Sequence, residues 1–165
     1  RLFLKDRLNF LNGVSFGVGH GGVESILLVG MAYINNIIYS VMINHGIFEK
    51  SFGKALPANV LSSIKNTLIS TPDYAFLLAG FERVFTILIQ IALSLIVLQA
   101  VSKKKIGYLF LAILIHTIVD TPVAYMTLKG VNMFLIELIV MVFAILALTY
   151  IVRSKDSDKI QDMAN

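Results

Sequence analysis

Two pairs of side chains in this sequence have the types and the spacing that acid–base or metal chemistry requires. His20 precedes Glu24 by four residues in the stretch GVGHGGVES, and His116 precedes Asp120 by four residues in AILIHTIVD. Residues four apart share one face of a helix, so each pair could present an imidazole and a carboxylate to one point. Such groups bind divalent metals such as zinc, and a carboxylate that binds no metal can instead take a proton from water.

A third polar group interrupts the apolar stretch FERVFTILIQIALS, which contains Glu82, Arg83 and Gln90. On a helix, Glu82 and Gln90 would lie about 80° apart around the axis and roughly 12 Å apart along it. Both could therefore line one cavity, although they could not both lie at its centre. Glu137 has no partner at helical spacing in its own apolar stretch, and we expect it to be structural.

The composition places these polar groups in a membrane. Hydrophobic residues make up 57% of the 165 residues, charged residues make up 15%, and the mean hydropathy is +0.81. A soluble domain carries about a quarter charged residues. The chain has no cysteine, which excludes disulfides and Cys-ligated zinc. It also has neither a phosphate loop nor an aromatic–basic pattern, so we expect no nucleic-acid partner.

We expect an all-α, polytopic membrane helical bundle. Crossing a bilayer takes about 20 apolar residues, and four stretches qualify, at about residues 14–44, 75–101, 106–128 and 131–152. They would form a single domain over residues 1–152, followed by a polar C-terminal tail at 153–165. A helix over 14–44 would be about 46 Å long, which exceeds the hydrocarbon core, so we expect this first span to be long or broken.

The distribution of Lys and Arg predicts the orientation of the spans. Nine lie on one side of the predicted membrane, namely Arg1, Lys5, Arg7, Lys103, Lys104, Lys105, Arg153, Lys155 and Lys159. The other side carries Lys50, Lys54, Lys65 and Lys129. We therefore expect an integral protein of the cytoplasmic membrane with both termini of the given chain cytoplasmic. On the outer surface, LPANVLSSIKNTLI predicts an amphipathic helix.

Ionisable groups inside spanning helices cost at least about 2.5–3.5 kcal/mol, so they normally face a partner or a hydrated cavity. We expect one polar cavity among the first three spans. Structural readings of the individual motifs remain open: a polar, glycine-rich helix entry at residues 20–24, a hydrogen-bonded His116–Asp120 pair, and a self-contained Glu82–Arg83 ion pair. The functional reading depends on the joint occurrence of these groups in three spans.

In this order, GVGHGGVES, FERVFTILIQIALS and AILIHTIVD resemble the motifs of the YhfC family of intramembrane peptidases. That family is similar to the CAAX-prenyl protease and bacteriocin-processing membrane enzymes. The resemblance covers about residues 10–125. It implies a helical-bundle membrane peptidase in which a glutamate activates water and histidines hold a metal or the oxyanion. It also implies further spans upstream of Arg1.

The resemblance also implies roles for individual residues. Glu24 and Glu82 are candidates for the general base, and His20 and His116 are candidate metal ligands or oxyanion donors. Asp120 takes a position usually held by Asn or Asp and would orient His116. The cofactor would be zinc or another divalent metal, or there would be none.

The family pattern has a histidine where this chain has Gln90. An amide donates hydrogen bonds but is a poor zinc ligand. Three explanations stay open: an engineered inactive form, a natural non-catalytic relative, or an enzyme that needs no metal at that position.

We therefore expect an intramembrane peptidase that hydrolyses a peptide bond at a buried polar site. Its partners would be membrane lipids and a peptide or membrane-protein substrate. The alternatives are an inactive pseudo-protease that binds a membrane protein and, less favoured, a transport or channel subunit. Buried carboxylates and histidines also build proton relays, but the sequence shows no inverted repeat.

Overall fold

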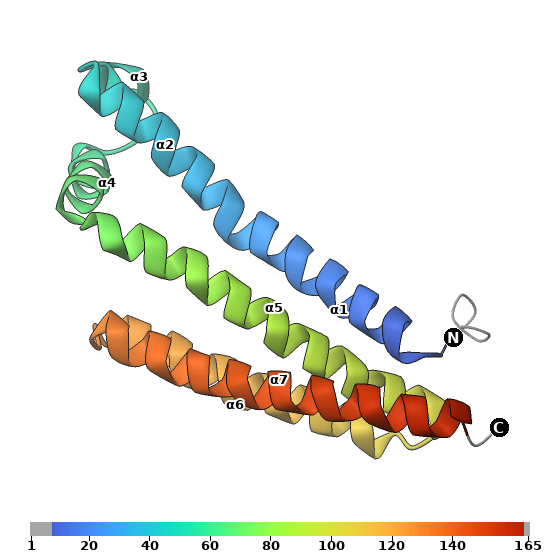
Figure 1. Ribbon diagram of the computed structural model, residues 1–165. Coiled ribbons are helices and arrows are strands. Elements are labelled where there is room, and N and C mark those ends of the chain that lie inside the picture. The colour runs from blue at the N-terminus through green and yellow to red at the C-terminus, as the bar shows by residue number, and fades with distance from the viewer. Residues whose placement is uncertain (1–7, 164–165) are drawn as a thin grey trace. The chain divides into compact units, whose positions relative to one another are not determined.

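The computed structural model describes residues 8–163, with side chains described up to Asp156. This part of the chain is helical and contains no strand. The elements are α1 (Phe10–Glu24), the π-helix η1 (Ser25–Gly30), α2 (Met31–Asn44), α3 (Phe48–Phe52), α4 (Ala58–Ser70), α5 (Asp73–Ser102), α6 (Gly107–Leu128) and α7 (Met133–Met163), all labelled by helix number in Figure 1 except η1. The predicted all-α membrane bundle is confirmed.

Among the described residues, four helical segments are long and apolar enough to cross a membrane: Phe10–Asn44, Asp73–Ser102, Gly107–Leu128 and Met133–Asp156. They match the four predicted spans. A helix is the form that such sequences take in lipid because it satisfies every backbone N–H and C=O internally. The predicted amphipathic helix is present as α4, and α7 continues as a helix beyond residue 152.

The first span is both long and interrupted, as its sequence predicted. It covers 35 residues, about 52 Å at 1.5 Å per residue. Its α-helical hydrogen bonding changes to π-helical immediately after Glu24, at Ser25–Gly30. Segments of π-helix inside α-helices are rare and often occur at functional sites.

The helices pack in two compact units. The first contains the described residues up to Val23 and from Leu78 onward, and the second contains Glu24–Leu77. The single domain expected over residues 1–152 stays a prediction. So does the orientation, part of which rested on Arg1, Lys5, Arg7 and Lys159, which lie outside the residues whose side chains are described.

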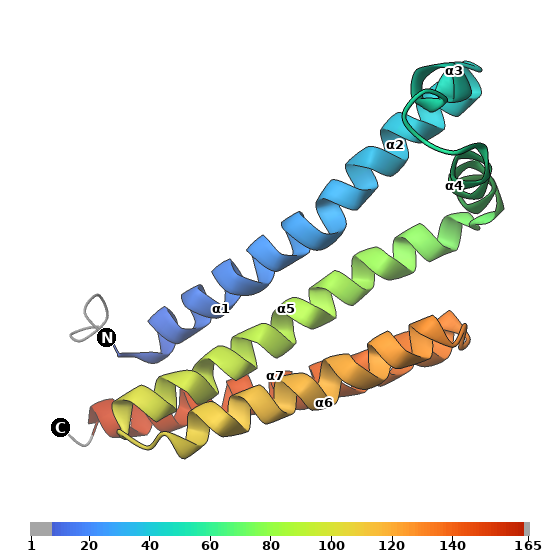
Figure 2. The same ribbon diagram turned by 180° about the vertical axis from the view of Figure 1, so that it is seen from behind.

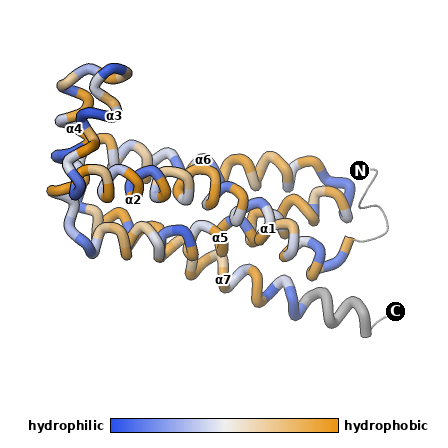
Figure 3. The backbone as a smooth tube through the Cα atoms, turned by 90° about the horizontal axis from the view of Figure 1, so that it is seen from above, coloured by the Kyte–Doolittle hydropathy of each residue, from blue (hydrophilic) through white to orange (hydrophobic). Residues whose placement is uncertain are grey.

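The core of the first unit lies among α5, α6 and α7, which run side by side in both views (Figures 1 and 2). Its buried residues are Ile89, Ala92, Leu93, Ile96, Ala112, Val119, Val140, Ala144 and Ala147. Apolar residues dominate these helices, and polar residues collect toward the end of α7 (Figure 3). Alanines on α6 and α7 let the helix backbones approach closely, which is the usual basis of helix packing in lipid.

The helix α1 packs on α5 through three glycines. Gly13, Gly17 and Gly21 are buried and recur every fourth residue, so they form one stripe on the helix. A Cβ at Gly17 would lie 2.5 Å from the Ile91 Cα, and a Cβ at Gly13 would lie 2.8 Å from Leu95 Cδ2. The missing side chains are therefore what allows the two backbones to touch.

The second unit is held together by an aromatic cluster and by the ion pair of Lys65 with Glu49. The Tyr39 ring packs edge-on against Phe48 and Phe52, each at 5.5 Å between centroids. Phe48 is buried, as is Leu61 of α4. The helix α2 ends at Asn44, and Gly46, two residues later, adopts the left-handed conformation with φ +66°, which turns the chain toward α3.

We expect Gly17→Ala to destabilise the first unit, because a methyl group there would meet the backbone of α5. Overpacking of this kind costs about 1–3 kcal/mol. The matched control is Gly19→Ala, on the same helix, where an added Cβ meets nothing within 4 Å. Thermal unfolding in detergent should show a lower midpoint for Gly17→Ala alone. Equal midpoints for the two variants would contradict the close packing of α1 on α5.

Candidate functional site

A pocket of about 260 Å³ opens on the first unit where α1, α5 and α6 meet. His20 of α1, Gln90 of α5 and His116 of α6 all line it. The remaining lining residues are Phe16, Leu93, Ser94, Val97, Leu109, Ala112, Ile113 and Thr117. The structure thus brings together three of the polar positions that the sequence singled out, one from each of the first three spans.

The glycine stripe of α1 determines how His20 approaches the pocket. A Cβ at Gly21 would lie 3.1 Å from the Gln90 Cβ, so α1 rests directly on the Gln90 side chain. His20 adjoins this contact in sequence. Its ring stacks on Phe16, one turn earlier, with 6.2 Å between centroids and 5° between planes. This stacking restricts the orientation of the imidazole.

Gln90 and Ser94 are the polar residues that the described part of the chain buries, at 4% and 8% exposure. They are four residues apart on α5 and therefore share the face that forms the pocket wall. Sequence analysis missed Ser94 and Thr117. The signal was available, because Ser94 repeats the four-residue spacing from Gln90 and Thr117 directly follows His116.

The second imidazole–carboxylate pair forms a contact within α6. His116 Nε2 lies 3.0 Å from Asp120 Oδ2, and the two side chains are 42% and 56% exposed. The four-residue spacing of the sequence accounts for this contact. Pro122 follows in the interior of the same helix. It has no N–H to donate to the carbonyl of Ile118.

Glu82 lies outside the described lining of this pocket and pairs with the neighbouring Arg83. The carboxyl group of Glu137, on α7, interacts electrostatically with both. Arg83 Nε and Glu137 Oε2 are buried without a hydrogen-bond partner. Among the described residues, the pocket with its histidines is therefore separate from the ionisable cluster Glu82, Arg83 and Glu137.

Glu24 is the last residue of α1 and the first residue of the second unit. It is partly buried and directly precedes the π-helix η1. The structure does not test its role as a base, which stays a prediction, as do the roles of Glu82, His20, His116 and Asp120.

The described residues do not by themselves fit a complete metal site. Catalytic zinc normally takes three protein ligands. The pocket offers two imidazoles with the amide of Gln90, and nowhere among the described side chains of residues 8–156 do three or more of His, Cys, Asp or Glu come together in a group that could hold a metal ion. The third imidazole that the family resemblance predicted would stand at position 90, where this chain has a glutamine.

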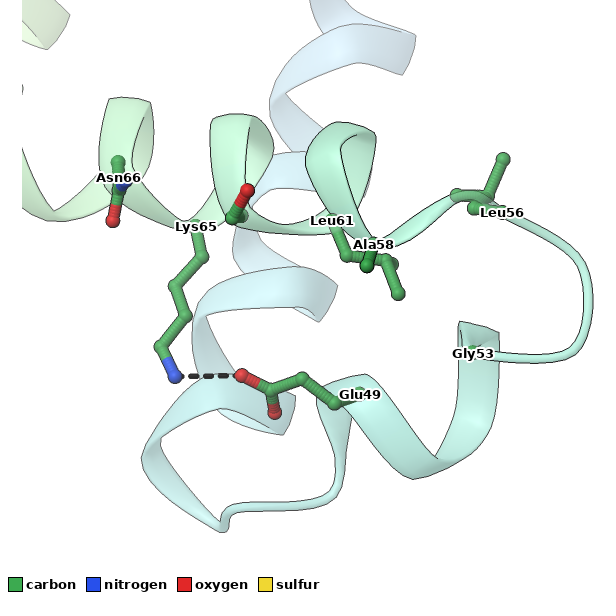
Figure 4. Close-up of a pocket in the computed structure, with 8 residues that line it drawn as sticks. Glu49, Gly53, Leu56, Ala58, Leu61, Lys65 and Asn66 are labelled. Carbon is green, nitrogen blue, oxygen red and sulfur yellow. Dashed lines mark hydrogen bonds and ion pairs between the residues drawn. The ribbon is translucent and has the colours of Figure 1, made fainter.

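A second hollow, of about 510 Å³, lies in the second unit between α3 and α4 (Figure 4). Its charged residues are Glu49 and Lys65, whose side chains meet at 2.6 Å and are both exposed. The hydrogen bond from Lys65 lowers the pKa of the Glu49 carboxyl below its usual value of 4.5. This ion pair links two surface helices and contains no nucleophile or imidazole, so we do not regard it as the reactive site.

The fold and the pocket together define an integral membrane protein with imidazole and amide side chains converging between its spanning helices. The model of the YhfC intramembrane metalloprotease family matches residues 1–140. The chain therefore belongs to this family, as the sequence motifs indicated.

The chain is similar to a protein of Bacillus subtilis (strain 168) named "Uncharacterized membrane protein YhfC". The two are 36% identical over 157 residues, which cover 94% of this chain and 60% of the relative. The chain thus spans less than two thirds of that relative's length. No solved structure matches it.

We expect the pocket to be hydrated, and the absence of cysteine makes this measurable by single-cysteine labelling. In Thr117→Cys, the thiol would line the pocket, whereas in Ile118→Cys it would lie on the exposed apolar face of α6. A thiol reacts as the thiolate, which needs water. A water-soluble methanethiosulfonate should label Thr117→Cys at least about tenfold faster. Equal rates in liposomes would show that the pocket is dry.

We expect Lys65→Gln to raise the pKa of Glu49 toward 4.5, because it removes the hydrogen bond that lowers this pKa. A lowered folded-state pKa contributes stability above the unfolded-state value, and this contribution is lost as the pH falls through the folded-state pKa. The α3–α4 contact should therefore weaken below about pH 4.5. NMR titration of labelled Glu carboxyls measures the shift. The control Lys54→Gln should leave this pKa unchanged.

Proposed function

We propose that the chain carries the active centre of an intramembrane peptidase, which hydrolyses a peptide bond of a membrane-embedded substrate. The observation that supports this most directly is the meeting of His20, Gln90 and His116, from three different helices, at one pocket. Polar residues inside spans are costly, so their convergence favours a function at that point. The name of the family describes the same class of reaction.

The proposed reaction uses a glutamate to activate water. Glu24 or Glu82 would accept a proton from a water molecule while the water oxygen attacks the carbonyl carbon of the substrate. The carbonyl oxygen then becomes an oxyanion. The same glutamate would pass the proton to the leaving amine as the C–N bond breaks.

His20, Gln90 and His116 would stabilise the oxyanion. An imidazole N–H and the Gln90 amide both donate hydrogen bonds, and donors fixed in advance around a developing oxyanion are usually the largest single contribution to catalysis. Asp120 would position His116, because its carboxylate contacts Nε2; the ring could then donate to the oxyanion only in its doubly protonated form, which keeps an N–H at Nδ1.

The proposed steps do not depend on a metal. The family name implies one, and zinc or another divalent ion would use His20 and His116 as ligands. A third ligand would have to be added to the described set, because Gln90 stands at the position of the expected histidine. The donors present suit an oxyanion better than a zinc ion.

We also propose that the protein lies in the cytoplasmic membrane with the Lys103–Lys105 turn on the cytoplasmic side. The supporting observation is the excess of Lys and Arg at that end of the spans. The substrate would then be a peptide or membrane protein that reaches the pocket from within the bilayer.

A non-catalytic role is the second candidate, because Gln90 occupies a wall of the pocket. In that case the same hollow would hold a peptide segment of a membrane-protein partner without cleaving it. Binding without turnover would support this alternative.

The test uses purified protein in liposomes with transmembrane peptides, and mass spectrometry detects the fragments with and without Zn²⁺. We expect Gln90→His to cleave at least as fast as the unaltered chain. Replacement of both candidate bases, Glu24→Gln with Glu82→Gln, should lower the rate by about 10²–10⁴-fold, the usual worth of a general base.

The control is Glu49→Gln, which removes a carboxylate outside the spanning helices and should leave the rate unchanged. Cleavage that survives the double glutamine replacement would show that neither glutamate is the base. If the unaltered chain and Gln90→His both bind peptide and neither cleaves it, the non-catalytic role replaces the peptidase.

A further inference from the structure

The first unit has a further hollow, also of about 510 Å³, whose lining differs in chemistry from that of the histidine pocket. It lies where the start of α1, the end of α5 and the later part of α7 meet. Its lining residues are Leu8, Phe10, Leu95, Leu98, Gln99, Ser102, Lys103, Tyr150, Arg153 and Ser154. We refer to it as the basic pocket.

The polar wall of the basic pocket suits an anion. Among its described lining residues are two cations, Lys103 and Arg153, and no acid. Ser102 and Ser154 also line it, but the Ser102 hydroxyl already donates to the Gln99 carbonyl at 3.5 Å, so the two cations are the groups that would hold an anion. Cationic side chains are the usual partners of a phosphate group, because charge-assisted hydrogen bonds are the strong ones.

Lys103, which directly follows α5, is held in place by contacts with neighbouring side chains. Lys103 Nζ donates to Gln99 Oε1 at 3.4 Å and lies 5.2 Å from the centroid of the Tyr108 ring. Gln99 Nε2 in turn donates to the Tyr150 hydroxyl at 2.8 Å, which ties α5 to α7. Because these contacts already restrict the Lys103 side chain, binding of a ligand would cost less side-chain conformational entropy.

The turn after α5 fixes this arrangement. Lys104 adopts φ +54°, the left-handed conformation, and the backbone N–H of Lys105 donates to the Ala100 carbonyl at 3.1 Å. These features form the helix-ending motif in which glycine usually stands. The turn places the side chain of Lys103 in the pocket lining, whereas neither Lys104 nor Lys105 is part of it.

The opposite wall is apolar. Leu8, Phe10, Leu95 and Leu98 line it. Leu95 and Leu98 are also the residues nearest to Gly13 of the glycine stripe, so this wall continues into the α1–α5 contact. In a chain that spans the membrane, a hollow with a cationic rim and an apolar wall matches a ligand with an anionic head and an acyl tail.

We propose that the basic pocket binds one anionic phospholipid, with its headgroup phosphate between Lys103 and Arg153 and an acyl chain along Leu8 and Leu98, the partly exposed leucines of the apolar wall. Both cations complement the phosphate: Lys103 directly follows α5, Arg153 belongs to α7, and both helices line the hollow. A bound lipid would fasten α1 to α5 at the end where the glycine stripe begins. The proposal is independent of the peptidase activity.

The test measures thermal unfolding of the purified chain in detergent as phosphatidylglycerol is added, with phosphatidylcholine as the zwitterionic comparison. A ligand that binds the folded state raises the unfolding midpoint. We expect phosphatidylglycerol to raise it and phosphatidylcholine not to. Lys103→Gln with Arg153→Gln should weaken lipid binding at least about tenfold, since two charge-assisted contacts are lost.

The matched control is Lys105→Gln, which removes the same charge from the same turn outside the pocket and should retain the phosphatidylglycerol effect. If the double variant unfolds before lipid is added, Lys103→Gln alone is used, with native mass spectrometry counting bound lipid. If Lys105→Gln and Lys103→Gln weakened lipid binding equally, the lipid would be held by diffuse electrostatic attraction and not at a defined site. An equal rise with phosphatidylcholine would overturn the anionic headgroup. An equal rise with inorganic phosphate or glycerol 3-phosphate would overturn the lipid in favour of a soluble phosphate.

Discussion

The contact of α1 with α5 is the constraint on which the histidine pocket depends. Gly13, Gly17 and Gly21 have no side chain to hold the helices apart, and a single methyl at Gly17 would collide with the α5 backbone. Lipid supplies little hydrophobic force between helices, so such close packing is what stabilises them. Because Gly21 rests on the Gln90 side chain, the same contact fixes one wall of the pocket and brings His20 to its edge.

Much of the fold could be predicted from the sequence. The four spans follow from apolar length alone, and the interruption of the first follows from its excess over the bilayer thickness. The pairing of His116 with Asp120 follows from their four-residue spacing. Which helix faces which does not follow, because spacing fixes the face of a residue only within its own helix. The cluster of Glu137 with Glu82 and Arg83 joins two helices and was therefore missed.

The polar groups within the spans divide into two kinds of environment. Glu82 and Arg83 form an ion pair within α5, and Glu137 of α7 places a second, partly buried carboxyl near them. His20, Gln90 and His116 instead line a hollow and share it with the hydroxyl groups of Ser94 and Thr117. The first cluster joins two packed helices, whereas the second surrounds a hollow that can admit a ligand. Composition alone does not distinguish them.

Pro122 has a consequence for the environment of the His116–Asp120 pair. In α6 it leaves the carbonyl oxygen of Ile118 without the amide proton that a regular helix would supply. This oxygen lies between the two members of the pair in sequence, so the backbone adds an acceptor to a stretch that already holds an imidazole and a carboxylate. Hydrocarbon cannot solvate such an oxygen. The proline thus leaves this turn of α6 with a carbonyl oxygen that needs a hydrogen-bond donor such as water, whatever chemistry the side chains perform.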